Sequence, residues 1–162
     1  MIHNVGMASV PAEVVADFVA DMLRREGAVW VREASSSMWP LIQPGDELRL
    51  VPVDGPAARP GMIVAYRADR AIVVHRLLSH GSGFIVTKGD ALTEPDAPVA
   101  WDRILGRVAA LRMCAGGVVD LESGPRALVL RALGQLARLR APNRLVSILL
   151  RVPFYLAARA VR

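Results

Sequence analysis

The stretch Met62–Leu78 reads MIVAYRADRAIVVHRLL and decides the fold. Two runs rich in β-branched and aromatic residues, Met62–Tyr66 and Ala71–Leu78, stand on either side of a short and mostly polar segment. Runs of this composition around a polar turn are typical of two antiparallel strands joined as a hairpin. The stretch therefore predicts the central hairpin of a β-rich core.

Runs of the same kind continue on both sides of this hairpin, separated by turns rich in Gly, Pro and Asp. We expect further strands at Ala28–Glu33, Asp46–Val53, Phe84–Thr87 and Ile104–Met113, and a short one at Val118–Glu122 that pairs with its predecessor across Gly116-Gly117. Many short strands at this spacing favour a mainly β fold, either a small barrel or a sandwich.

Helical periodicity appears before and after the β region. Apolar residues recur at helical spacing over Pro11–Arg25, and Gly27 suits the position just past a helix end. After Pro125 the pattern becomes helical again, with a break at Pro142-Asn143. With 162 residues, the chain has room for one domain with appendages. We divide it into an N-terminal helix (1–27), a core (28–123) and a basic amphipathic helical tail (124–162).

The formal net charge of +5 is concentrated in the tail, where Arg126–Arg162 holds eight arginines and no acidic residue. Upstream of the tail, acids and bases nearly cancel, so no nucleic-acid partner is expected for the core. The apolar runs of the tail are shorter than the roughly 20 residues that span a bilayer. Two interpretations stay open: helices lying on a membrane surface, or helices docked on the core or on a partner protein.

The N-terminus lacks the basic and apolar pattern of a secretory signal. We therefore expect a location in the cytoplasm or at the inner membrane as a peripheral protein. The single Cys114 excludes an internal disulfide and a thiolate zinc cluster, and it is expected to be a small buried residue. His75, His80 and Asp90 have no persuasive metal-ligand spacing, so we expect no metal and no cofactor.

A set of short motifs runs through the core in a fixed order. The first is ASSSMWP at Ala34–Pro40, which follows a predicted strand and precedes Pro44-Gly45-Asp46, where Asp46 is expected to tie the turn. The others are RPGMIV at Arg59–Val64, VVHRL at Val73–Leu77, TKGD at Thr87–Asp90 and GRV at Gly106–Val108.

This ordered set resembles the signal-peptidase and LexA-type serine proteases over about Glu33 to Val108. Their signature is a serine directly before Met-x-Pro, then a Pro-Gly-Asp turn, a strand bearing the catalytic base, and a Lys-Gly-Asp box. The resemblance implies a small β fold of that kind and an endopeptidase with Ser37 as nucleophile. It also implies an oxyanion hole made by the Ser37 N–H and the Ser35 hydroxyl. Met38 and Trp39 are expected to line the core or a pocket, and their place next to the nucleophile also makes them candidates for the wall of the substrate groove.

The position of the base is occupied by His75, as in the archaeal and endoplasmic-reticulum signal peptidases, rather than by lysine. Lys88 is the only lysine and belongs to the Lys-Gly-Asp box, so histidine is the preferred base. Two aspartates, Asp90 and Asp96, have the six-residue spacing of the histidine-type relatives. Either one could orient His75. Arg76 is expected to pair with Asp90 or Asp102.

The chemistry has a physical basis that does not depend on the family. A serine hydroxyl is a weak nucleophile at neutral pH and needs a base within hydrogen-bond reach. A neutral imidazole can take the proton, and a carboxylate on its other nitrogen fixes the tautomer and stabilises the imidazolium. Activity is then expected to fall on acidification through about pH 7 to 6, where imidazole side chains protonate.

The expected function is cleavage of an extended leader-like or signal-like peptide, which is also the expected partner. The missing N-terminal anchor favours a dedicated peptide over general processing of exported proteins. Two alternatives are a LexA-like regulator that cleaves itself and a non-catalytic peptide-binding module that has kept the fold.

Overall fold

The computed structural model describes residues 11–69, 71–114 and 116–123. One helix, α1 (Ala12–Glu26), precedes a β region with two short 3-10 helices at Gly55–Ala57 and Trp101–Arg103. The strands are β1 (Val29–Arg32), β2 (Glu47–Val51), β3 (Ile63–Arg67), β4 (Ile72–His80), β5 (Phe84–Lys88), β6 (Val99–Ala100), β7 (Ile104–Arg112) and β8 (Val118–Asp120). The predicted helical tail, 124–162, lies outside the described residues, as do residues 1–10.

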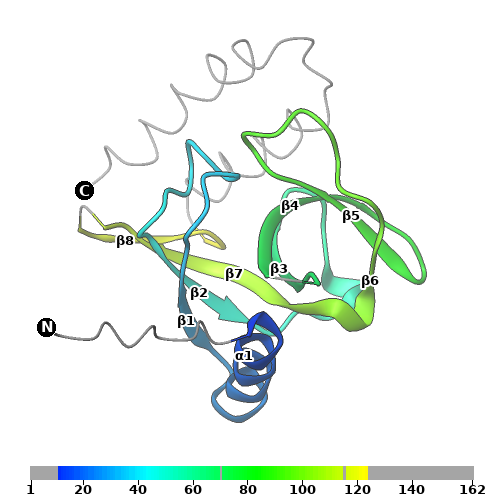
Figure 1. The fold of residues 1–162 in the computed structure, drawn as a ribbon, viewed down its shortest axis with the longest axis horizontal. Helices are drawn as coiled ribbons and strands as arrows, with labels where there is room; N and C mark the ends of the chain where they lie inside the picture. Colours follow the sequence, from blue (N-terminus) through cyan, green and yellow to red (C-terminus); the bar gives the residue numbers. More distant parts are fainter. Residues whose placement is uncertain (1–10, 70, 115, 124–162) are drawn as a thin grey trace, which may run out of the picture.

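All strands belong to one antiparallel sheet with the order β1-β2-β7-β3-β4-β5-β6, and β8 pairs with β7. The sheet is strongly curled and resembles half of a barrel (Figure 1). The register shifts within the β2–β7, β3–β7 and β4–β5 pairs. Such bulges increase the local twist and bend of a strand, which accounts for part of the curl.

The sequence pattern predicted most of these elements. The helix and the longer strands are confirmed within one or two residues, and β8 pairs with β7 as expected. Gly27 ends α1 in the left-handed conformation, with φ 71°, which is accessible to glycine at little cost. The structure adds β6, a two-residue strand that pairs with β5. A strand of that length has no detectable sequence period.

Buried apolar side chains form two clusters on opposite faces of the sheet. Successive residues of a strand point to opposite faces, and in β3 Ile63 and Ala65 belong to the larger cluster while Val64 belongs to the smaller one. Both faces of β3 are therefore covered, which explains why its sequence is an almost continuous apolar run.

The helix α1 packs against the larger cluster beside β1 and β7 (Figure 1). Its buried residues, Ala16, Val19 and Leu23, have helical spacing. A Cβ atom added to Gly106 of β7 would lie 2.5 Å from Val51 O of β2 and 3.4 Å from Leu23 Cδ1. The absence of a side chain at Gly106 thus leaves room for the backbone of β2, and Leu23 of the helix lies beside it.

Asp46 ties its turn as predicted, because its fully buried carboxylate accepts hydrogen bonds from the backbone N–H groups of Gln43 and Cys114. The prediction that Cys114 is buried is wrong: its side chain is exposed. Cys114 lies just after the end of β7. Its backbone N–H, and not its thiol, points to the buried Asp46.

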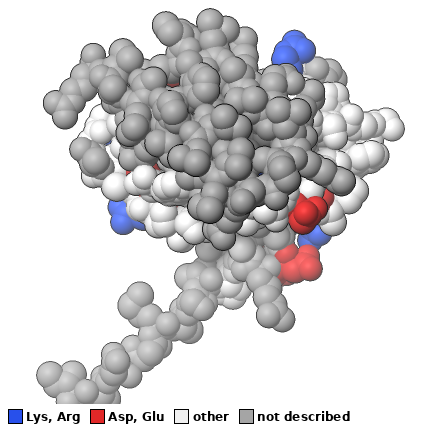
Figure 2. Space-filling view, turned by 90° about the horizontal axis from the view of Figure 1, so that it is seen from above, with Lys and Arg blue, Asp and Glu red and all other residues white. Residues whose placement is uncertain are grey.

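Among the described residues, no helix has the length and apolar character needed to cross a bilayer. In the view from above, acidic and basic side chains of the described part are visible at its rim, and at one place on the rim the two signs lie next to each other (Figure 2).

Candidate active site

The Ser35–Ser37 segment follows β1 and is held by a buried carboxylate. Glu33 accepts a hydrogen bond from the Ser35 N–H at 2.7 Å, and its side chain is buried. Its backbone is tied to the neighbouring turn, since the Glu33 N–H donates to Asp46 O and the Gly45 N–H donates to Glu33 O, both at 2.8 Å. The start of the serine-rich segment is therefore fixed at both the backbone and the side chain.

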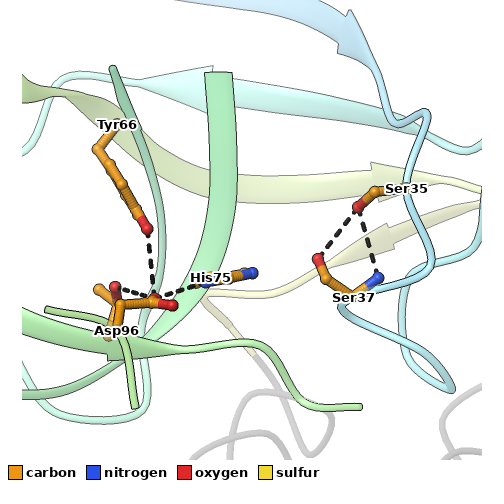
Figure 3. Close-up of polar contacts among 6 residues, drawn as sticks. Ser35, Ser37, Tyr66, His75 and Asp96 are labelled. Atoms are coloured by element: carbon orange, nitrogen blue, oxygen red, sulfur yellow. Dashed lines mark hydrogen bonds and ion pairs between the residues drawn. The ribbon is translucent and has the colours of Figure 1, made fainter. Parts of the chain in front are cut away.

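Ser35 and Ser37 lie side by side at the end of this segment (Figure 3). Their hydroxyl oxygens are 3.0 Å apart, and the Ser37 N–H is directed at Ser35 Oγ at 3.4 Å. The two groups expected to stabilise an oxyanion, the Ser37 N–H and the Ser35 hydroxyl, are thus adjacent to the Ser37 hydroxyl. A developing negative charge beside Ser37 Oγ would have both donors near it.

The imidazole of His75 projects from β4, and its side chain is only 7% exposed. Its Nδ1 atom lies 2.6 Å from Asp96 Oδ2. An ionised carboxylate only accepts hydrogen bonds, so Nδ1 carries the hydrogen in this contact. In the neutral ring Nε2 is then the atom with the free lone pair, as a general base requires.

Asp96 Oδ2 is a shared acceptor with three side-chain contacts. Besides His75, the Thr87 hydroxyl donates to it at 2.6 Å and the Tyr66 hydroxyl at 3.3 Å. The Asp96 N–H also donates to Thr87 O at 2.8 Å, which places the residue against β5. Figure 3 shows the carboxylate between Tyr66 and His75.

These contacts change the pKa values of the group. Burial alone would raise the pKa of Asp96, but the hydrogen bonds from His75, Thr87 and Tyr66 and the charge of a protonated His75 outweigh it, so the pKa lies below its ordinary value. Burial, together with the adjacent Asp96 carboxylate, raises the pKa of Tyr66 to about 12. The Tyr66 hydroxyl therefore stays protonated and remains a donor at working pH.

Gly89 brings Ser37 and His75 together. A Cβ atom at Gly89 would lie 2.8 Å from Ser37 O and 2.9 Å from His75 Nε2, so these two atoms approach the same point. The next turn is tied to the same place, because the Ala91 N–H donates to Ser37 O at 2.8 Å. The imidazole of His75 points toward Ser37 (Figure 3).

Asp90 and Asp96 differ in their partners. The Arg76 Nε and Nη2 atoms donate to the two oxygens of Asp90 at 2.8 and 2.6 Å, and Nη1 donates to Gly61 O. The side chains of Arg76 and Asp90 are 0% and 5% exposed. The structure therefore pairs Arg76 with Asp90 and not with Asp102, and it is Asp96 whose carboxylate contacts the His75 ring.

A groove of about 770 Å³ begins at this site. It is lined by Ser35, Ser37 and His75, and beyond them by residues of β1, β4 and α1. In the described part of the chain, β1 and β4 each have an edge without a strand partner. β1 is the last strand of the sheet, and the residues of β4 before Arg76 do not pair with β5. Open backbone edges beside a groove can pair with an extended peptide.

Met38 and Trp39 do not line the groove. Met38 is fully buried and belongs to the larger apolar cluster, so its interpretation as a core residue is confirmed and its assignment to the groove is wrong. Trp39 is half-buried, and its side chain is not among those that line the groove. The chain turns sharply after Ser37, with the Trp39 N–H bound to Ser36 O and the Ile42 N–H bound to Met38 O, and this turn points Met38 into the core.

Several residues of the site had no role predicted from the sequence, namely Glu33, Tyr66, Thr87 and Gly89. Thr87 and Gly89 belong to the TKGD motif, which points to this segment but does not predict what each residue does. Tyr66 and Glu33 had no comparable signal, because a strand tyrosine and a glutamate before a loop are common in surfaces and cores alike.

Within the described ranges, no group of three or more His, Cys, Asp and Glu side chains is placed to hold a metal ion. Comparison with protein-family models, with curated proteins and with solved structures finds no match for this chain.

Proposed function

We propose that this chain is a serine endopeptidase that cleaves an extended peptide with Ser37 as nucleophile, His75 as general base and Asp96 as the residue that orients the base. The observation that carries the proposal is the 2.6 Å contact between His75 Nδ1 and Asp96, with His75 Nε2 turned toward Ser37 beside Gly89. The motif order that resembles signal peptidases and LexA-type proteases supports the same reading, including a fold of that kind.

In the first half of the reaction, Ser37 Oγ attacks the peptide carbonyl while its proton passes to His75 Nε2. Asp96 stabilises the imidazolium that forms, and the Thr87 and Tyr66 hydroxyls keep the carboxylate in place. His75 then gives the proton to the leaving amine as the C–N bond breaks. The product is an ester between Ser37 and the N-terminal part of the peptide.

The tetrahedral oxyanion is stabilised by the Ser37 N–H and the Ser35 hydroxyl. Ser35 must exchange its contact with Ser37 Oγ for one with the oxyanion, which it can do by rotating its hydroxyl hydrogen. In the second half, a water molecule gives its proton to His75 and attacks the ester. Ser37 Oγ leaves with the proton from His75, and the enzyme returns to its starting state.

The groove supports an extended peptide as substrate, because β1 and the start of β4 flank it next to Ser37 and His75 with edges that pair with no other strand among the described residues. The resemblance to signal peptidases implies small side chains just before the cut, and a leader-like peptide is the substrate class we favour. Contact of the basic tail with a membrane stays a prediction.

Cleavage of a proteome-derived peptide library, read by mass spectrometry, tests the proposal. We expect specific cleavage by the wild type, none by Ser37→Ala or His75→Ala, and undiminished cleavage by Ser36→Ala. Ser36 is the matched control because it is an exposed serine next to the nucleophile. Cleavage that persists in Ser37→Ala would contradict the assignment.

The alternatives give different results in the same preparation. A self-cleaving regulator converts into two fragments on incubation, and Ser37→Ala stays intact, which an intact-mass time course detects. A non-catalytic module binds peptides and cleaves neither them nor itself.

A further inference from the structure

The helix α1 carries apolar side chains that the core does not use. Phe18 is 60% exposed and Val15 is 39% exposed, although both are large and apolar. They lie three positions apart and so share one side of the helix, next to the buried face that includes Val19. Apolar residues grouped in this way on a surface mark binding sites more often than isolated ones do.

Phe18 and Val15 both line the groove that begins at Ser37 and His75. Val29 and Val31 of β1 line the same groove, as do Ile72 and Val73 of β4. Trp30, between the two valines, points to the opposite face of the sheet, where the Arg112 guanidinium lies 4.2 Å over its ring. The apolar surface is therefore continuous with the candidate catalytic residues. The groove volume of about 770 Å³ lies within the range of ligand-binding clefts.

The helix is a fixed wall of this groove. Its buried residues pack on the sheet, Leu23 lies beside Gly106 of β7, and the Asp17 carboxylate accepts a hydrogen bond from Arg67 of β3 at 2.6 Å. Exposed ion pairs contribute little to stability, so the apolar contacts hold the helix. A rigid wall can discriminate between side chains of different size and polarity.

We propose that α1 is a specificity element, in which Phe18, with Val15, selects a large apolar side chain of the peptide that Ser37 cleaves. The proposal rests on the proposed function, because the peptide substrate is the occupant of the groove. This occupant is favoured because the apolar wall is continuous with Ser37 and His75 and with edges of β1 and β4 that have no strand partner in the described part of the chain.

Peptide binding to a Ser37→Ala background, which leaves the groove in place, tests the wall separately from catalysis. The probes are fluorescent alanine-based decapeptides that carry either leucine or serine at one position, scanned along the peptide. We expect one leucine position to tighten binding relative to serine. Adding Phe18→Ser should weaken the best leucine peptide by about 10-fold or more and remove most of the preference, since that peptide loses the burial of an aromatic side chain.

Val14→Ser is the matched control, because Val14 is 54% exposed on the same helix and does not line the groove. The Ser37→Ala protein that also carries Val14→Ser should bind each peptide with the same affinity as Ser37→Ala alone. Equal leucine preference in the Phe18→Ser and Val14→Ser variants would overturn the proposal. So would a concentration-dependent dimer that Phe18→Ser dissolves and that the leucine peptide does not displace, because the groove would then bind a second copy.

The two proposals fail in different ways. If library cleavage depends on Ser37 but its residue preferences are the same in Phe18→Ser and Val14→Ser, the specificity wall is wrong and the proposed function stands. If the leucine preference in binding depends on Phe18 but no peptide is cleaved by the wild type, the proposed function is wrong and the groove still selects apolar peptides.

Discussion

The ring of His75 has a carboxylate at one nitrogen and the backbone of the candidate nucleophile near the other. Asp96 contacts Nδ1, whereas Ser37 O and Nε2 both approach the open side of Gly89. Three side-chain groups in turn contact Asp96 Oδ2, so the carboxylate has little freedom to rotate. The position of the base is therefore set by short contacts among buried or half-buried residues, whereas the hydroxyl of Ser37 contacts Ser35.

Asp96→Asn should lower kcat by about 10⁴-fold, because an amide can hold the ring in the wrong tautomer and no longer stabilises the imidazolium. The measurement is steady-state cleavage of a peptide taken from the library. Thr87→Val is expected to give a smaller loss, since it removes one donor from the carboxylate and leaves the charge. A loss of less than 10-fold in Asp96→Asn would show that Asp96 does not orient the base.

Gly89→Ala should reduce kcat by about 100-fold or more. The new methyl group would collide with Ser37 O and His75 Nε2 and push them apart, and small misplacements of reacting groups cost about this much. Gly83→Ala is the control, because nothing lies within 4 Å of a Cβ atom there. Equal kcat values for the two variants would mean that Ser37 and His75 need not be close.

The sequence predicted Ser35, Ser37 and His75 through their motifs, and these residues do lie near one another. It left Asp90 and Asp96 as equal choices, because a six-residue spacing does not tell which carboxylate faces the ring. The pairing of β4 with β5 decides which carboxylate contacts the ring. It sets Arg76 opposite Lys88, and the Asp96 N–H donates to Thr87 O in β5. Such a long-range register is not encoded in any local pattern.

At the scale of elements, the buried pair Arg76–Asp90 joins β4 to the loop that follows β5. The same loop carries Gly89, so the pair fixes the turn that lies between Ser37 and His75. A buried arginine left without its carboxylate is costly. The pair therefore influences the site indirectly, because it holds the loop that carries Gly89.

Asp90→Ala should reduce the free energy of unfolding by about 3–5 kcal/mol, because it leaves the buried charge of Arg76 uncompensated. Urea denaturation followed by tryptophan fluorescence measures this. Asp102→Ala is the matched control: Asp102 is exposed, and its loss should change stability by no more than about 0.5 kcal/mol. Similar values for both variants would contradict a structural role of the pair.

The elements were more predictable than their assembly. Strand periodicity and turn residues placed the longer strands, because each of these signals is local. The groove was assigned to Met38 and Trp39, next to the nucleophile in sequence, whereas the structure forms it from α1, β1 and β4. Segments far apart in the chain line it together, and sequence proximity carries no information about that.

For the molecule as a whole, the lowered pKa of Asp96 predicts a pH dependence of stability. Because the pKa is lower in the folded state than its ordinary value of 3.8, the carboxylate stabilises the fold above pH 3.8, and this contribution is lost as the pH falls through the lower folded value. Asp96→Asn should therefore be less stable than the wild type at pH 7, with a difference that shrinks below pH 3.8.

Urea denaturation of both proteins from pH 7 to pH 2 measures this dependence. The pKa of Glu47 is also lowered, first of all by its hydrogen bond with Arg112, so Glu47→Gln tests a second carboxylate, on β2. A stability difference between wild type and Asp96→Asn that is constant over the whole pH range would mean that the carboxylate gains nothing from its three partners.

The central claim, that His75 and Asp96 activate Ser37, is tested most directly by covalent labelling with a fluorophosphonate and mapping of the adduct by peptide mass spectrometry. We expect one adduct, on Ser37, that forms in the wild type and in Ser36→Ala and is absent or strongly slowed in His75→Ala and Asp96→Asn. An adduct on another residue, no adduct at all, or labelling of Ser37 at the same rate without His75 would contradict it.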